Sequence, residues 1–192
     1  MKKLAAIFCL SAIATAAFAQ GIVTFNNNPN TLISATINGS TATISGAAGS
    51  YYFGLLAGPN LTFTQLYATN SGAAAGRFIG GNVAVPGWAP GTAEQYEVVG
   101  WSSSLGHTFN PAWLTTAPNG LFGKSAIANG PVAGGVDANG ISFPTPQLFG
   151  GNGIPTGFGL TGSTVVPPVP EPSSMALAGL GAAALLIFRR RK

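Results

Sequence analysis

Charged residues are scarce in this chain of 192 residues, because Asp, Glu, Lys and Arg make up 6% of it against about 25% in an average protein. So little charge excludes the highly charged, weakly hydrophobic kind of disorder. Six of the eight Lys and Arg residues lie at the two ends, so the rest of the chain has no basic patch to bind phosphates, which excludes nucleic acid as a partner. The charged residues between positions 20 and 168 are Arg77, Lys124, Glu94, Glu97 and Asp137.

Cysteine and histidine occur once each, as Cys9 and His107. A zinc site takes most of its ligands from these two residue types, so an ordinary zinc site is excluded, and we expect no metal or other cofactor. His107 follows three serines at positions 102–104, but no nucleophile elbow surrounds them. Asp137, the remaining member of a formal triad, is distant in sequence. We therefore expect no serine-hydrolase triad.

Glu94 and Glu97 are three residues apart. On a strand this spacing puts them on opposite faces, where they cannot act as a catalytic pair. On a helix it would put them on one side, as a glycosidase uses two carboxylates. Residues 96–99 are rich in aromatic and β-branched side chains, which favours the strand. General acid–base chemistry needs titratable groups, and with so few of them we predict that the protein is not an enzyme.

The first 20 residues, MKKLAAIFCLSAIATAAFAQ, have the three regions of a secretory signal peptide. Lys2 and Lys3 form a positive region, residues 4–17 are mostly apolar, and Ala17 and Ala19 form an A-x-A cleavage site. We predict that signal peptidase removes residues 1–19 and leaves Gln20 as the mature N-terminus. Cys9 leaves with this segment, so we expect no disulfide, although the chain enters a compartment that permits them.

The other end of the chain is a short apolar run followed by a basic cluster. Residues 173–188 are apolar or small on every side, so they do not form an amphipathic surface helix. A helix of this length spans about 24 Å, which snorkelling and local thinning can match to a hydrocarbon core of about 30 Å. We predict a short transmembrane span, with the basic cluster on the cytoplasmic side of the inner membrane. The cluster consists of Arg189, Arg190, Arg191 and Lys192.

This end resembles the PEP-CTERM sorting signal of Gram-negative bacteria. The motif is Val169, Pro170, Glu171, Pro172 and Ser173, and the apolar span and basic stop follow it in the required order over residues 169–192. The resemblance implies that an exosortase-type membrane protease recognises Pro-Glu-Pro and removes the tail, as a GPI signal is removed. It also implies a secreted or cell-surface protein that passes through the inner membrane, in bacteria that make extracellular polysaccharide and biofilm. The part of the chain between the two end segments, residues 20–168, is called the body here. With stretches such as LLAGPN and VVGWSSSLG it looks like short secreted proteins of this kind, and this second resemblance implies no known activity.

Residues 20–144 consist of short candidate strands separated by turns. Glycine (28) and proline (14) are abundant, which favours turns over helices. Asn38-Gly39 is the strongest hairpin signal. The pattern predicts an antiparallel β sandwich or barrel-like domain, then a Gly/Pro-rich linker over residues 145–168. Within that linker GFGLTG (157–162) fits the dinucleotide motif G-x-G-x-x-G, but no helix can follow it. The expected strands are residues 21–25, 31–37, 41–45, 51–57, 61–69, 77–85, 94–103, 121–128 and 140–143.

Three tryptophans remain as candidates for binding. Trp101 lies on an expected strand, where burial in the core is the default for a large aromatic side chain. Trp88 and Trp113 either cover the ends of the sheet or stack on sugar rings. We therefore predict a non-enzymatic structural or matrix protein of the cell surface or extracellular polysaccharide. The alternative is a carbohydrate-binding module that uses Trp88 or Trp113.

Overall fold

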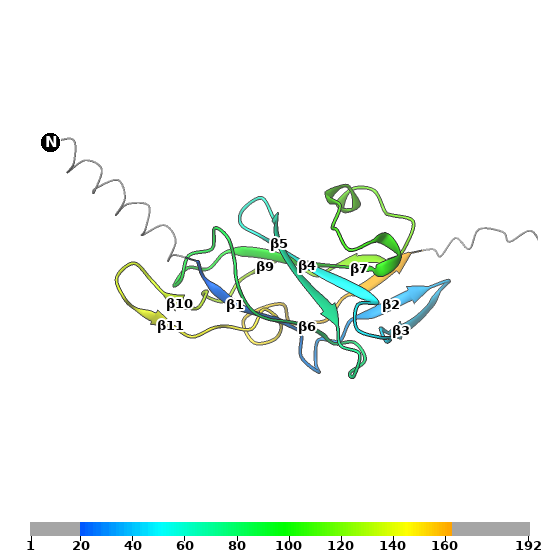
Figure 1. Cartoon of the computed structure of the whole chain (residues 1–192), viewed down its shortest axis with the longest axis horizontal. Helices are drawn as coiled ribbons and strands as arrows, with labels where there is room; N and C mark the ends of the chain where they lie inside the picture. Colours follow the sequence, from blue (N-terminus) through cyan, green and yellow to red (C-terminus); the bar gives the residue numbers. More distant parts are fainter. Residues whose placement is uncertain (1–19, 163–192) are drawn as a thin grey trace, which may run out of the picture.

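The computed structural model describes residues 20–162, and strand accounts for 44% and helix for 5% of them (Figure 1). The prediction of a mainly β domain is confirmed. The helical residues belong to two short 3-10 turns, η1 (Ser103–Leu105) and η2 (Pro111–Leu114). The strands are β1 (Ile22–Asn26), β2 (Ser34–Ile37), β3 (Ser40–Thr43), β4 (Tyr51–Ala57), β5 (Thr62–Asn70), β6 (Phe78–Ala84), β7 (Gln95–Ser102), β8 (Phe122–Lys124), β9 (Ala128–Asn129), β10 (Gly135–Val136), β11 (Ser142–Phe143) and β12 (Gly159–Gly162).

Ten of these strands form one sheet that curls into a half-barrel, in the order β1-β6-β5-β4-β7-β8-β12-β2-β3, with β9 also paired to β7. The prediction of two packed sheets was therefore wrong, whereas the barrel-like alternative is close to the structure. Irregular pairing of β1 with β6 and of β4 with β5 interrupts the ladder, and such bulges bend strands and increase their twist. A sheet bent in this way can enclose its own core. The remaining pair, β10 with β11, forms a separate two-stranded sheet.

The central strands bury side chains on both faces of the sheet. On β4, Phe53 and Leu55 belong to the main core on the concave side, whereas Leu56 belongs to a second cluster on the convex side. On β7, Tyr96 and Val98 point to the main core, and Val99 and Trp101 to the convex cluster. This is the alternation expected of strands. The convex cluster is the part of the fold that positions the candidate site.

The Asn38-Gly39 turn is confirmed as a two-residue hairpin between β2 and β3. Ile37 pairs with Ser40, and both turn residues have positive φ, 51° at Asn38 and 81° at Gly39. Positive φ at both central residues is the requirement of a type I′ turn, and Asn-Gly meets it with little strain.

The expected linker contributes to the domain in its described part, residues 145–162. Leu148, Phe149, Ile154 and Leu160 are fully buried, and β12 inserts between β8 and β2. β12 runs parallel to β2, so the sheet is not wholly antiparallel. The β domain therefore extends beyond residue 144 to at least Gly162.

The glycines that suggested a linker allow close packing instead. A Cβ at Gly157 would overlap the carbonyl oxygen of Leu32, and one at Gly162 would overlap the carbonyl oxygen of Gly120. Glycine is needed where backbones approach this closely. The signal peptide, the sorting motif and the apolar span lie outside the described residues. Within residues 20–162 no helix is long and apolar enough to cross a membrane.

Candidate functional site

The convex face of the sheet carries a group of aromatic rings that we call the convex aromatic cluster. Strands β4, β5, β7 and β8 supply part of it, and the loop between β7 and β8 supplies the rest. Neighbouring ring centroids lie 4.7–6.1 Å apart, which is the range of favourable aromatic pairs. Its members are Tyr52, Phe63, Tyr67, Trp101, His107, Phe109, Trp113 and Phe122.

The loop over this cluster is fixed at both of its short helical turns. Trp101 on β7 donates its indole N–H to the carbonyl oxygen of Gly106 at 2.9 Å, directly after η1. Asn110 caps η2, because its side chain accepts a hydrogen bond from the backbone N–H of Ala112 at 3.0 Å, and Pro111 follows at the first helical position. Both are favoured choices at a helix start. The loop therefore holds Phe109 and Trp113 against the sheet.

Trp113 is the half-buried tryptophan of the cluster. Its ring lies 6.0 Å from that of Trp101, 5.9 Å from Phe109 and 6.0 Å from Phe122. It is thus held by three rings while part of its surface faces solvent. This is the condition under which a tryptophan can stack on a ligand with little loss of side-chain entropy.

Trp88 lies elsewhere and does not meet that condition. Its side chain is 1% exposed, it packs 5.8 Å from the ring of Tyr96 in the main core, and its N–H donates to the carbonyl oxygen of Thr92 at 2.9 Å. Of the two alternatives for Trp88, the structure shows packing against the core, and its buried indole cannot stack on a sugar ring. The reason is packing, since the loop that carries Trp88 folds over the core and places the indole inside.

A groove adjoins the cluster between β5 and η2. It has a volume of about 370 Å3, and none of its lining residues is charged. Thr62 and Gln65 are its polar lining residues, and the others are apolar. The lining residues are Leu56, Leu61, Thr62, Phe63, Gln65, Phe109, Pro111 and Leu114.

Two groove residues have a left-handed backbone, with φ of 47° at Leu61 and 64° at Gln65. Gln65 lies in a bulge, because Gly54 and Leu56 of β4 pair with Tyr67 and Phe63 of β5, so three residues of β5 lie opposite Leu55. The hydroxyl of Thr64 donates to the carbonyl oxygen of Leu55 at 2.7 Å and stabilises this bulge. Non-glycine residues with positive φ are uncommon and store strain. The sequence signal for this site was the Gln-Leu pair that interrupts the alternation of β5, and our prediction missed it.

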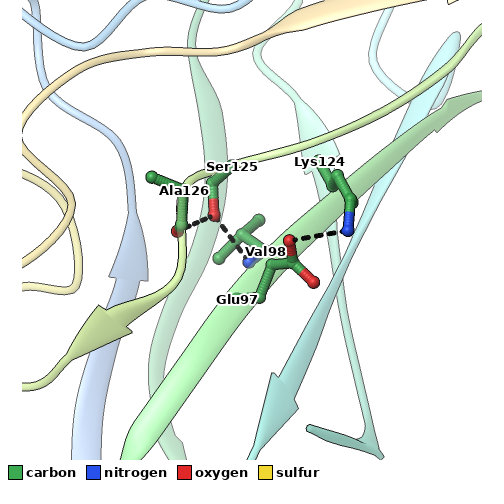
Figure 2. Close-up of polar contacts among 5 residues, drawn as sticks. All are labelled: Glu97, Val98, Lys124, Ser125 and Ala126. Carbon is green, nitrogen blue, oxygen red and sulfur yellow. Dashed lines mark hydrogen bonds and ion pairs between the residues drawn. The ribbon is translucent and has the colours of Figure 1, made fainter. Parts of the chain in front are cut away.

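Beside the cluster, Glu97 and Lys124 form an ion pair between β7 and β8 (Figure 2). The carboxylate of Glu97 and the ammonium of Lys124 are 3.4 Å apart, and the glutamate side chain is 4% exposed whereas the lysine side chain is 51% exposed. The next residue, Ser125, accepts a hydrogen bond from the backbone N–H of Val98 at 3.0 Å and donates one to the carbonyl oxygen of Ala126 at 2.8 Å. These contacts join β7 to the segment after β8.

The other sequence candidates do not meet at one place. Ser102 bonds to Ser104, with the two hydroxyls 2.7 Å apart, while the ring of His107 packs 4.8 Å from Tyr52 and 4.7 Å from Tyr67. Asp137 closes the turn between β10 and β11 by accepting hydrogen bonds from the backbone N–H groups of Asn139 and Ile141. Glu94 lines a separate hollow of about 220 Å3 beside Trp88. Among residues 20–162 no three His, Cys, Asp or Glu side chains are grouped as metal ligands.

A family model for the PEP-CTERM protein-sorting motif matches residues 168–192. This span contains the five motif residues from Val169 and the basic stop that ends at Lys192. The chain therefore carries a PEP-CTERM sorting signal, which implies processing by exosortase, a membrane protein, and fits a secreted or cell-surface protein of Gram-negative bacteria. No curated protein and no solved structure matches the chain.

Proposed function

We propose that the β domain is a non-enzymatic structural component of the cell surface or extracellular matrix, delivered by cleavage of the sorting tail. The observation that carries the proposal is the sorting motif at residues 168–192. Four titratable side chains of the body have structural contacts that support a structural role: Glu97 with Lys124, His107 with two tyrosines, and Asp137 with its own turn.

Processing of the tail tests the delivery step. We expect the mature protein to begin at Gln20 and to end near the Pro-Glu-Pro motif, so peptides from residues 189–192 should be absent from the extracellular fraction. Replacing Pro170, Glu171 and Pro172 by alanine should leave unprocessed protein in the inner membrane. The matched control Pro167→Ala, which lies just before the matched residues 168–192, should be processed normally. Equal release of both variants would show that the motif is not recognised.

An activity screen tests the non-enzymatic part. The exported protein and a variant with Glu94→Gln, Glu97→Gln, His107→Asn and Asp137→Asn are compared on polysaccharide, ester and peptide substrates. We expect no turnover in either protein. Turnover in the parent that the variant lacks would make the protein an enzyme and overturn the structural role.

A second candidate function is carbohydrate binding on the convex face. The observation in its favour is Trp113, half-exposed and held by three rings next to an uncharged groove. An aromatic face suits the C–H face of a sugar ring, and Gln65 supplies an amide for hydroxyl groups. The absence of charge among the lining residues of this groove favours a neutral glycan.

Titration with the organism's own extracellular polysaccharide, followed by tryptophan fluorescence, separates the two candidates. If the convex face binds glycan, fluorescence changes saturably and Trp113→Ala abolishes the response. Ile141→Ala is the matched control, because it truncates an exposed apolar side chain in the β10–β11 hairpin, away from the cluster. If the fluorescence of the parent does not change during the titration, carbohydrate binding is rejected and the structural role is the remaining candidate.

A further inference from the structure

The two edge strands of the sheet differ in whether the backbone N–H and C=O groups on their outer side have hydrogen-bond partners. Edge strand β1 is covered by the chain itself: Ile22 exchanges two backbone hydrogen bonds of 2.9 Å with Gly134, and the N–H of Thr24 donates to the carbonyl oxygen of Pro146 at 2.8 Å. The carbonyl oxygen of Thr24 in turn accepts from Leu148. The outer side of β1 is therefore closed to other strands.

Edge strand β3, at the opposite end of the strand order, is open among residues 20–162. It pairs with β2 alone (Figure 1). All four of its residues, Ser40, Thr41, Ala42 and Thr43, are exposed. Natural edge strands are commonly protected by charges, proline or a covering segment. The sequence of β3 contains neither charge nor proline. An uncharged, unprotected edge is a template for another strand.

The hairpin determines which groups of β3 point outward. Ile37 and Ser40 flank the two-residue turn, so they exchange backbone hydrogen bonds, and Ala35 and Ala42 do the same two residues further on. The intervening residues, Thr41 and Thr43, direct their N–H and C=O groups away from β2. Thr36 and Thr41 exchange no backbone hydrogen bonds with each other, and the side chains of such a pair lie closer together. Their two hydroxyls are accordingly 2.7 Å apart.

This pattern is self-complementary. If β3 meets a second β3 in antiparallel orientation with the two Ala42 residues opposite each other, Thr41 of each strand lies opposite Thr43 of the other. Each of the two Thr41–Thr43 pairs then exchanges two backbone hydrogen bonds, so that four bonds form around a two-fold axis. The small side chains of the two Ala42 residues meet at the axis, where the strands approach most closely, and threonine pairs flank them.

We propose that β3 is a dimerisation edge that pairs antiparallel with β3 of a second copy of this chain, with Ala42 on the two-fold axis. Because β1 is closed, this pairing produces a closed dimer and no filament. Four residues from each copy are far fewer than the roughly 20–30 a side of a standard interface. The dimer is therefore weak and forms where copies are concentrated, as on a surface. The proposal is independent of carbohydrate binding.

Disulfide trapping tests the register. In the full chain with Cys9→Ala, an introduced cysteine is the single thiol. Under mild oxidation, Ala42→Cys should form covalent dimers, since opposite residues at a non-hydrogen-bonded pair come within the Cβ separation of a disulfide. The matched control Thr41→Cys is also at an exposed position but has no cysteine opposite it. We expect the Ala42→Cys variant to form its covalent dimer about tenfold faster or more than this control.

Two further measurements make the result decisive. Adding Thr43→Pro, which removes one outward N–H, should slow the trapping at position 42 to the control rate. In the parent, amide hydrogen exchange of Thr41 and Thr43 should slow as protein concentration rises. Equal trapping rates at positions 41 and 42 would indicate random collision and overturn the proposal. Exchange protection that does not change with concentration would show that a segment of the same chain covers β3, which overturns it equally.

Discussion

At the residue scale, Tyr96 joins the sheet to the segment after residue 144. Its hydroxyl donates to the carbonyl oxygen of Leu148 at 2.6 Å and accepts from the N–H of Ile154 at 3.2 Å, and its ring is fully buried. Burial raises the pKa of Tyr96 well above its ordinary value, although the hydrogen bond from Ile154 lowers it. The phenol is therefore kept neutral inside the fold.

The pKa of Tyr96 predicts how stability depends on alkaline pH. The folded chain holds the phenolic proton more tightly than the unfolded chain, whose tyrosine titrates near 10. Stability from this group is therefore fully present below about pH 10 and decreases as pH rises above it. Tyr96→Phe removes this dependence but loses both buried hydrogen bonds of the hydroxyl, with a loss of about 1–3 kcal/mol at neutral pH. Urea unfolding of both proteins between neutral pH and pH 11 checks this, and parallel pH profiles would contradict it.

The Glu97 and Lys124 pair gives a second prediction at this scale. Lys124→Met leaves the carboxylate of Glu97 buried without its cation, and we expect a loss of about 1–2 kcal/mol in the free energy of unfolding, because half-exposed Lys124 is partly screened by solvent. The double variant Glu97→Gln with Lys124→Met should recover part of the loss, since it removes the uncompensated charge. Denaturant unfolding of the four proteins forms a double-mutant cycle. Additive losses would show that the two groups are not coupled.

At the element scale, the bulge of β5 holds Gln65 in a conformation that glycine adopts more readily. A left-handed backbone costs a non-glycine residue roughly 1–2 kcal/mol, whereas glycine gives up about 0.5–1 kcal/mol of chain entropy. We expect Gln65→Gly to raise the free energy of unfolding by up to about 1 kcal/mol. The control Gln95→Gly, in β7 without positive φ, should lower it. A destabilised Gln65→Gly variant would show that the Gln65 side chain stabilises the bulge by its own contacts.

Local patterns predicted most of the strands from the sequence. β4 was predicted with the bounds it has, because YYFGLLA is a compact apolar run between turn residues, and the Asn-Gly turn located the β2–β3 hairpin. β12 was missed, because its sequence GLTG contains two glycines and resembles a linker. One of them, Gly162, is required because a Cβ there would overlap the backbone of Gly120 and Leu121, which are far away in sequence. Local sequence therefore gives no indication of this strand.

The candidate site was predicted only in part, for a similar reason. The sequence identified Trp113 as a large aromatic residue in a loop, but it could not distinguish Trp113 from Trp88. The two differ in what covers them: Trp88 is enclosed by the main core, whereas Trp113 lies at the outer surface of the convex aromatic cluster. Coverage by distant segments is a tertiary property, and so is the groove at Gln65, which forms where β5 meets η2.

At the scale of the whole molecule, β12 closes the sheet between two groups of strands. β8 lies on one side of it and the β2–β3 hairpin on the other, so without β12 the hairpin has no partner in the rest of the sheet. The segment from residue 145 to residue 162 also adds five apolar side chains that are at most 9% exposed: Leu148, Phe149, Ile154, Phe158 and Leu160.

The burial of these five side chains predicts how far the β domain can be shortened from its C-terminal side and still fold. Burial of each of the five side chains contributes about 1.5–3 kcal/mol, so together they account for roughly as much as the 5–15 kcal/mol that stabilises a typical domain. A chain of residues 20–144 should therefore lack a cooperative unfolding transition, whereas one of residues 20–162 should unfold cooperatively with the strand content of the whole body. Circular dichroism during thermal unfolding measures both. A cooperative transition in the shorter chain would mean that the β domain folds without β12 and the segment before it. The prediction that a linker begins at residue 145 would then be right.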